Sequence, residues 1–534
     1  MFRRRHATPL EHHLVDEFDA GRLTRRQLLR RLSVIGAGVA LASGWPRSSH
    51  SQERAGAVIR LSAHAPAGSI DPLRSNDATS ILLLTQVAEF LVTNWPDGLR
   101  PSLAESWAPN ADGSVWTFRL RRGVLFHSGQ PLTAGDVVAT MDRLTDPASG
   151  SGGASLFRGT LSKGGTQRRD DYTVEFHLDR PNASFPYYVS SDHINAAILP
   201  NGNGGNFQSG FVGSGPFRLQ RYRANQGVVL TRNPQWWGGA VLPERIEASF
   251  HPSEPSQTLA MLSGDVDLAF VSAFATQPLL KDRRFRIERL PSSAHFQLHM
   301  RNDVAPFNDR RVREAFALAI DRPRLIGLLY RGFAELGNDA PLAPALSVTD
   351  ASVAQRGRNL QKARALFQAA GVRTLPFPLV APRWLEIPNY AVLVQSALRE
   401  AGVDLSLRID ALEKYYGSAK FGTSPWLDSP LAITDYASRG FPDVYLGAAL
   451  SSTGIWNAAR FHNEEFDRLF AQYQRTLDLH SQRVIARDMQ QLLLAETPMV
   501  VPFFRNVLMP IDARLRDVEA NPFGWVSLAR AWRA

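Results

Sequence analysis

The chain has 534 residues, of which 44% are hydrophobic and 21% charged, as in an ordinary soluble globular protein. This length allows two or three domains and a core large enough to need no disulfide or metal. The absence of cysteine excludes a disulfide framework, a thiolate zinc site, an iron–sulfur cluster and a cysteine nucleophile. The formal net charge is +10, but the basic residues are scattered rather than striped, which argues against nucleic-acid binding.

The N-terminal 57 residues hold ten Arg and five acidic residues, which is half of the net charge. The pair Arg25-Arg26 precedes a short apolar run, 32–42, and this arrangement resembles a twin-arginine export signal. The run is shorter than the roughly 20 residues that span a bilayer. Small residues favour cleavage after Ala42 or as late as Ala57. We predict a signal peptide and a periplasmic protein exported already folded; the alternative is a basic amphipathic helix on a folded domain.

Apolar periodicity after the leader predicts a mixture of strands and helices. Strands are expected at 58–62, 115–120, 216–220, 228–232, 265–270, 404–409 and 498–504. Helices are expected at 79–93, 311–320, 359–370, 389–401, 463–475 and 479–495, with another beginning near Asp321. Thr133 and Asp136 form a predicted capping box, and Asp309 is a predicted N-cap. Strands and helices mixed throughout the chain indicate an α/β protein.

Four groups of motifs follow one another along the chain. They are LAESW (103–107) with 116–129 and 131–138; VGSGPF (212–217) with RNPQWW (232–237); SGDVDL (263–268); and PFNDRRVR (306–313) with AIDR (319–322). Together they resemble the peptide and nickel class of periplasmic solute-binding proteins, family 5 of the bacterial extracellular binding proteins, from about residue 58 to the end. Most of these residues are expected to serve the fold: Trp116, Phe118 and Phe126 as core, and Gly213 and Gly215 as a turn between lobes.

The resemblance implies a periplasmic binding protein of type II, with two main lobes, a smaller inserted lobe and a ligand cleft between lobes. The expected first lobe combines 58–92, 213–295 and 500–534. The expected inserted lobe is 93–212, and the second ligand-closing lobe is 296–499. Crossings near 295 and 500 would carry a hinge that closes the lobes over a ligand. The implied partners are a small-molecule or peptide ligand and the transmembrane subunits of an ABC permease. The protein is expected to be a monomer without a cofactor.

The ligand site implied by the resemblance lies in the stretch 434–443. Peptide-binding relatives carry here an aspartate that pairs with the ligand's α-ammonium group. Alignment on Pro442-Asp443 places Tyr436 at the family's Trp and Arg439 at this aspartate. A guanidinium prefers a carboxylate or phosphate. This position would therefore bind a negatively charged group, where the peptide-binding relatives bind a positively charged one.

Three interpretations of Arg439 remain open. It can bind an anionic group of the ligand, which is the interpretation we favour. It can instead pair with an acid of the protein while Asp435 takes the ammonium group, or it can be a surface residue of a loop.

Three further candidates come from the resemblance. Trp456 and Asn457 correspond to an aromatic-Asn segment beside the family's pocket, where Trp would form an apolar wall and Asn would bind an amide or hydroxyl. His64 follows the first strand, where relatives also line the cleft.

Enzymatic motifs are missing from the sequence. The stretch 462–465 lacks the second histidine of a zinc-protease motif, and no Gly-x-Ser-x-Gly elbow is present. We therefore expect no enzyme but the substrate-binding subunit of an ABC importer, which captures a peptide or a peptide-like or anionic small solute. The alternatives are a nickel or metallophore carrier and a ligand-loaded partner of a membrane sensor.

Overall fold

The computed structural model describes residues 56–66, 68–75, 77–95, 98–151, 153–202, 204–522 and 525–534. The predicted signal peptide lies outside the described residues. No helix in the described part of the chain is long and apolar enough to cross a membrane. The fold is a mixed α/β fold, as the sequence predicts.

A twelve-stranded sheet runs through the molecule in the order β10-β11-β12-β1-β13-β20-β14-β18-β16-β17, with β15 paired to β20 and β19 paired to β14. Its strands are β1 (Val58–Ala63), β10 (Phe217–Arg223), β11 (Gly227–Arg232), β12 (Arg245–Phe250), β13 (Leu268–Ala269), β14 (Phe285–Met300), β15 (Ala334–Leu336), β16 (Leu379–Pro382), β17 (Leu407–Asp410), β18 (Leu431–Tyr436), β19 (Met499–Val500) and β20 (Phe503–Asp512).

One end of this sheet belongs to what we call the first lobe: β1, β10 to β13 and the adjoining ends of β14 and β20. Its helices are α4 (Ala78–Val87), α8 (Glu254–Ser263), α9 (Ala273–Thr276) and the 3-10 turn η3 (Gln277–Leu279). Its small two-stranded ladders are β8 (Gly205–Asn206) with β9 (Gly210–Phe211), β21 (Leu515–Arg516) with β24 (Trp532–Arg533), and β22 (Glu519–Ala520) with β23 (Val526–Ser527). The alternating residues Ile59 and Leu61 of β1 are fully buried in its core, which confirms the predicted first strand.

The inserted lobe has its own four-stranded sheet in the order β4-β5-β7-β6. Its elements are β2 (Val92–Trp95), β3 (Gly98–Pro101), β4 (Ala104–Pro109), β5 (Val115–Leu120), α5 (Ala134–Thr145), α6 (Ala154–Phe157), β6 (Thr166–Asp170), β7 (Thr173–His177), α7 (Phe185–Tyr188) and η2 (Ile194–Ala196). Trp116, Phe118 and Phe126 are buried in its core, as predicted. The capping box of Thr133 and Asp136 at the start of α5 is also confirmed.

The third lobe holds the other end of the large sheet, β15 to β19 with the adjoining ends of β14 and β20. Its helices are α10 (Arg310–Ala319), α11 (Arg322–Tyr330), α12 (Leu360–Ala369), α13 (Ile387–Glu400), α14 (Leu412–Tyr416), α15 (Pro425–Asp428), the π-helix η4 (Val444–Ala448), α16 (Glu464–Arg475) and α17 (Leu479–Glu496). Asp309 caps α10 and Asp321 caps α11 through their carboxylates, as the sequence indicates.

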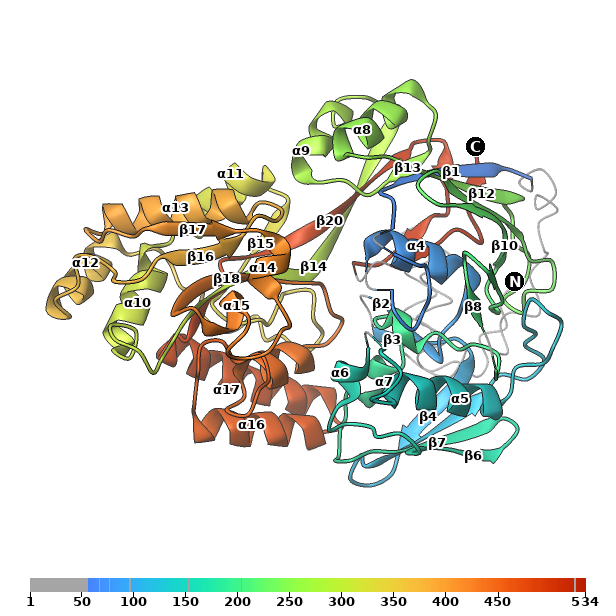
Figure 1. The fold of residues 1–534 in the computed structure, drawn as a ribbon, viewed down its shortest axis with the longest axis horizontal. Helices are drawn as coiled ribbons and strands as arrows, with labels where there is room; N and C mark the ends of the chain where they lie inside the picture. The colour runs from blue at the N-terminus through green and yellow to red at the C-terminus, as the bar shows by residue number, and fades with distance from the viewer. Residues whose placement is uncertain are drawn as a thin grey trace, which may run out of the picture. The chain divides into compact units, whose positions relative to one another are not determined.

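Only β14 and β20 pass from the first lobe into the third within the large sheet (Figure 1). They pair antiparallel from Phe285 and Asp512 to His295 and Phe504, with an irregularity between Pro291 and His295. The two strands therefore form a ribbon whose regular pairing is interrupted where it enters the third lobe.

Helix α4 is shorter than the sequence predicts. It ends at Val87 rather than near residue 93, and 92–95 form the strand β2. Gly215 donates its N–H to the carbonyl of Val87 at 3.1 Å, and a Cβ on Gly213 would overlap that carbonyl. These two glycines pack against the C-terminal end of α4 and take the space of a further helical turn. The apolar residues that follow Val87 are therefore extended. Both glycines thus pack closely against the end of α4.

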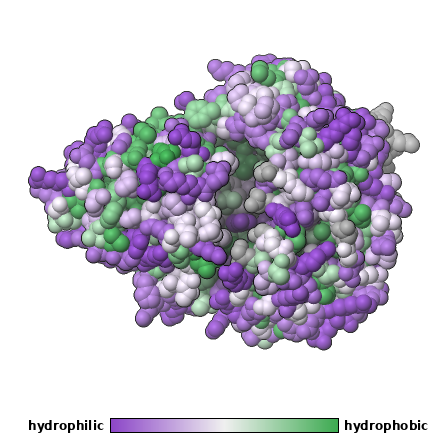
Figure 2. Space-filling view, viewed as in Figure 1, coloured by the Kyte–Doolittle hydropathy of each residue, from purple (hydrophilic) through white to green (hydrophobic). Residues whose placement is uncertain are grey.

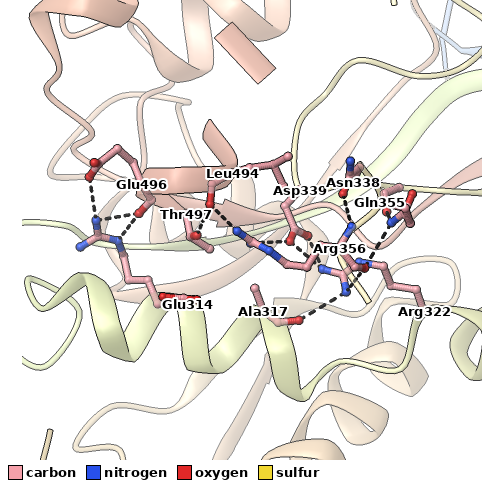
Figure 3. Close-up of polar contacts among 12 residues, drawn as sticks. Glu314, Ala317, Arg322, Asn338, Asp339, Gln355, Arg356, Leu494, Glu496 and Thr497 are labelled. Atoms are coloured by element: carbon pink, nitrogen blue, oxygen red, sulfur yellow. Dashed lines mark hydrogen bonds and ion pairs between the residues drawn. The ribbon is translucent and has the colours of Figure 1, made fainter. Parts of the chain in front are cut away.

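A buried ion cluster fixes the helices of the third lobe (Figure 3). Asp339 is fully buried and accepts hydrogen bonds of 2.6 and 2.7 Å from Arg322 and of 2.8 Å from Arg356. Arg356 also donates to the carbonyl of Leu494 at the end of α17. The loop around Asp339 is thus tied to both α11 and α17.

Candidate ligand-binding site

The surface is hollowed where β14 and β20 cross between the lobes (Figure 2). Strand β18, which carries predicted site residues, pairs with β14 in this region. Successive residues of a strand point to opposite faces. Asp435 and Tyr436 therefore cannot both reach one face, and the structure places them in different surroundings.

Asp435 is partly buried and is held by three side chains of the third lobe. One carboxylate oxygen pairs with Arg505, and the other accepts a hydrogen bond of 3.1 Å from the indole of Trp384. The hydroxyl of Tyr416 accepts the backbone N–H of Asp435 at 3.3 Å. Both carboxylate oxygens of Asp435 thus have partners within the protein.

The guanidinium of Arg505 also interacts electrostatically with other groups near the crossing of β14 and β20. Burial lowers its pKa, but the neighbouring Asp435, Tyr330 and Glu386 outweigh burial and raise it above the ordinary value. The pKa of Glu386 is raised by burial, and Glu254 of the first lobe adds to this effect by charge repulsion. Carboxylates from the first and third lobes therefore lie within electrostatic reach of each other.

Arg439 has a fixed backbone and an unpaired side chain. The hydroxyl of Ser293 on β14 accepts its N–H at 2.7 Å and donates to its carbonyl at 2.6 Å. Within the described ranges, its half-buried guanidinium makes no hydrogen bond or ion pair. Its charge nevertheless affects Asp192 and His193 of the inserted lobe, which places the guanidinium near the junction of two lobes.

The segment after Arg439 docks into the inserted lobe. Gly440 donates its N–H to the carboxylate of Asp192 at 3.1 Å, and the amide of Asn94 donates to the same oxygen at 2.8 Å. Phe441 is 2% exposed and packs with the aromatic rings of Tyr188 and His193. The third lobe thus inserts an aromatic side chain into the core of the inserted lobe.

Asp443 makes a second polar contact between these lobes. One of its carboxylate oxygens accepts a hydrogen bond of 2.9 Å from the hydroxyl of Ser184. Burial raises the pKa of Asp443 to about 7, and burial likewise raises the pKa of Asp192 to about 7. Both carboxyl groups that join the lobes therefore titrate near neutrality.

The other predicted residues, apart from His64, serve packing or their own loop in the structure. Tyr436 is buried and packs on His295 and Tyr445 in the core of the third lobe. Asn457 donates to the carbonyls of Ser451 and Phe461 and accepts the N–H of Phe461, so its own loop uses its polar atoms.

Trp456 is partly buried and packs against the cores of both the inserted and the third lobe. His64 is exposed at the end of β1, and its ring lies 3.2 Å from the carbonyl of His251. Among the described residues, none of its hydrogen bonds reaches the other five candidates. The structure places Asp435 at the end of β18 and Arg439 in the segment that follows this strand, and leaves His64 on the first lobe.

Residues 98–454 match the profile described as "Bacterial extracellular solute-binding proteins, family 5 Middle". The chain belongs to this family. The peptide transport periplasmic protein SapA of Salmonella typhimurium is 27% identical across 94% of this chain and 97% of its own length. Di/tripeptide-binding protein 1 of Pseudomonas aeruginosa is 24% identical across 94% of this chain and 98% of its own length.

Solved structures share the fold of this family 5 protein. The ABC transporter-associated periplasmic binding protein DppA of Helicobacter pylori, in complex with the peptide STSA, matches with a TM-score of 0.73 at 21% identity over 90% of this chain and 99% of the relative. The substrate-binding protein CtaP of Listeria monocytogenes matches with a TM-score of 0.78 at 19% identity over 90% and 100%. The type II periplasmic binding fold is thereby confirmed, and the homologues are periplasmic binding proteins.

Several residues of this family 5 protein's site escape sequence reasoning. Arg505, Trp384 and Tyr416 surround Asp435 but lie 70, 51 and 19 residues from it in the chain. No motif marks them. Asp192 likewise carries no sequence signal, because its role comes from a contact 248 residues away with Gly440.

We predict that Gly440→Ala loosens the contact between the third and inserted lobes. A Cβ at this position would overlap the Asn94 amide and the Asp192 carboxylate. Overpacking of this kind costs about 1–3 kcal/mol. Small-angle scattering should show a larger radius of gyration for the variant. The matched control is Gly327→Ala inside α11, where no atom lies within 4 Å of the added Cβ; equal radii for both variants would contradict the prediction.

We also predict that three buried carboxyl groups stabilise the protein less as pH rises from about 4 to 7. Burial raises the folded-state pKa values of Asp192, Asp443 and Glu89 to about 7, above their ordinary values of 3.8 to 4.5. Between these limits the folded state binds more protons, so the free energy of unfolding falls with pH by up to about 1.4 kcal/mol per pH unit for each group. Four buried histidines, whose pKa values burial lowers, act in the opposite direction below about pH 6.5, so the carboxyl effect is measured as a difference between variants and the wild type: His127, His193, His295 and His299.

Urea unfolding at a series of pH values measures this slope. Relative to the wild type, Asp192→Asn and Asp443→Asn should each lose less stability between pH 4 and 7, because each removes one titrating carboxyl. A profile identical to that of the wild type in both variants would show that other groups cause the dependence.

Proposed function

We propose that this protein is the periplasmic substrate-binding subunit of an ABC importer, which captures a peptide or a peptide-like or anionic small solute and delivers it to the membrane permease. Membership of the solute-binding family supports capture rather than bond chemistry. The names of its relatives, which include peptide transport and di/tripeptide-binding proteins, support a peptide-like solute.

The ligand-recognising group in this proposal is the guanidinium of Arg439. It is half-buried, its backbone is held by Ser293, and its side chain has no hydrogen-bond partner in the described part of the protein. A partly desolvated guanidinium without a partner favours a carboxylate or phosphate, which it can grip with two parallel hydrogen bonds. Asp435, by contrast, already pairs with Arg505. These contacts favour an anionic group of the ligand at Arg439 over an ammonium group at Asp435.

Capture in this proposal works by lobe closure about the ribbon of β14 and β20. The irregular pairing between Pro291 and His295 gives this ribbon a place to bend. Closure removes water from the ligand and strengthens each polar contact, because the effective dielectric constant falls. Opening at the permease would reverse these gains and release the solute.

We predict that Arg439→Ala weakens ligand binding tenfold or more and leaves the melting temperature unchanged. The probe is the solute that copurifies with the protein from its own periplasm, identified by native mass spectrometry. Calorimetry with this solute measures the affinity. Arg439→Lys should recover only part of the loss, since a lysine keeps the charge but not the two parallel donors.

Arg399→Ala on the exposed side of α13 is the matched control and should bind like the wild type. Wild-type affinity in Arg439→Ala would refute the anion site.

The proposal includes export by the twin-arginine route. The double substitution Arg25→Lys and Arg26→Lys should abolish the appearance of the protein in the periplasmic fraction, because the export receptor reads the paired arginines. Immunoblots of cell fractions measure this distribution, with Arg22→Lys as the control. Undiminished export of the double variant would refute this route.

A further inference from the structure

Trp384 presents a large aromatic side chain in the turn between β16 and α13 of the third lobe. The residue is 43% exposed, although tryptophan is on average well buried. Its indole N–H donates to the carboxylate of Asp435 at 3.1 Å, so the polar edge of the ring already has a partner. The part of the indole that remains exposed is therefore apolar.

A series of side-chain contacts fixes the orientation of this indole. Asp435 uses one carboxylate oxygen for Trp384 and the other for its ion pair with Arg505. The guanidinium of Arg505 lies over the ring of Phe296 on β14, 4.6 Å from the ring centroid. Phe296 is fully buried in the core of the third lobe. The exposed indole is thus connected to this core through two charged side chains.

The backbone beside Trp384 is strained. Leu385 has a φ of 47°, in the left-handed region that a leucine rarely adopts. Two hydrogen bonds hold the turn: the Trp384 N–H donates to the carbonyl of Pro382 at 2.9 Å, and the Ile387 N–H donates to the carbonyl of Trp384 at 3.1 Å. Such strain persists only where the surrounding structure enforces it, and strained residues gather at ligand-binding sites.

The turn 383–386 lies at the edge of the sheet from which Arg439 also extends. The turn follows β16, which pairs in parallel with β18, and the segment with Arg439 follows β18. The carboxyl ends of parallel strands meet at one edge of a sheet, and ligands of open α/β sheets bind outside this edge. Trp384 and Arg439 are therefore placed to contact the same solute.

The same turn faces the first lobe. At the end of α11, Arg331 packs over the ring of Phe274 in α9 of the first lobe, 5.0 Å from the ring centroid (Figure 1). Tyr330, beside Arg331, donates its hydroxyl to the carboxylate of Glu386 in the turn at 3.5 Å. Burial raises the pKa of Glu386, and Glu254 of the first lobe raises it further by charge repulsion. The turn therefore lies between the two lobes that close over a solute in the proposed function.

We propose that the exposed indole of Trp384 is the surface on which the protein binds an apolar side chain of its solute, and that Asp435 positions this indole. The inference rests on the proposed function above and narrows the solute class to peptide-like molecules that carry an apolar side chain. When the lobes close over such a solute, the indole and that side chain leave water together, so their burial favours closure. Asp435 then serves the site through Trp384 rather than through the solute.

Calorimetry on the mature protein tests this surface with four probes: triglycine and the three tripeptides that carry one phenylalanine and two glycines. At least one phenylalanine peptide should bind the wild type about tenfold or more tightly than triglycine. In Trp384→Ala this ratio should fall to about threefold or less, because the ring that contacts the phenylalanine is gone. Leu479→Ala removes a similarly exposed apolar side chain at the start of α17 and should keep the wild-type ratio.

A double-mutant cycle tests the positioning role of Asp435. Asp435→Asn leaves one acceptor oxygen for two donors, Arg505 and the indole, so the preference for phenylalanine should fall about threefold. Trp384→Phe keeps a ring but has no N–H to donate. In this background Asp435→Asn should cause no further loss of preference, because Asp435 acts through the indole. An equal loss in both backgrounds would refute the positioning role.

Three results would overturn the inference. Equal affinity of the wild type for all four peptides, or a preference for phenylalanine that Trp384→Ala keeps, would refute the indole surface alone. Both leave the proposed function intact, since Arg439→Ala should weaken binding of all four peptides alike. The third result is no binding of any of the four to the wild type at millimolar concentration, which would leave an anionic small solute as the solute class of the proposed function.

Discussion

The antiparallel pairing of β14 with β20 connects the first lobe to the third lobe. The ribbon joins two cores that are otherwise built from separate clusters of buried residues. Its hydrogen bonds are regular inside the first lobe and irregular between Pro291 and His295. Ser293, which holds the backbone of Arg439, lies within this irregular stretch. The backbone of Arg439 is therefore held by the irregular stretch of the ribbon.

Burial determines the charge of the carboxyl groups at the junction of the inserted and third lobes. Asp192 and Asp443 each have one oxygen bound to the opposite lobe and one buried oxygen without a partner in the described part of the chain. Such carboxyl groups are stable mainly when protonated. Burial outweighs the opposing effect of the nearby Arg439 charge and keeps the pKa of Asp192 raised.

Local rules predict the elements of this fold well. The aspartate cap at Asp309, the helix start near Asp321 and the alternation of β5 depend on neighbours in sequence, and the structure confirms them. The end of α4 could not be predicted in this way, because it depends on two glycines more than 120 residues away. The strand predicted at 265–270 is shorter in the structure for a related reason. Of these residues, only Leu268 and Ala269 pair with neighbouring strands.

The site was predictable only where a motif marked it. The stretch 434–443 drew attention to Arg439, but nothing in the sequence shows that Asp435 is already paired with Arg505. Asn457 illustrates the opposite case. Its type suits ligand recognition, yet its side chain closes its own loop. Pairings between distant residues decide which polar groups remain available, and a single sequence does not contain them.

The aromatic docking of Phe441 has a thermal consequence. Its ring lies among Tyr187, Tyr188 and His193, so separation of the two lobes brings aromatic surface into contact with water. Hydration of apolar surface raises the heat capacity. Separation of these two lobes would therefore carry a positive heat-capacity change, and the hydrophobic part of their contact would weaken on cooling.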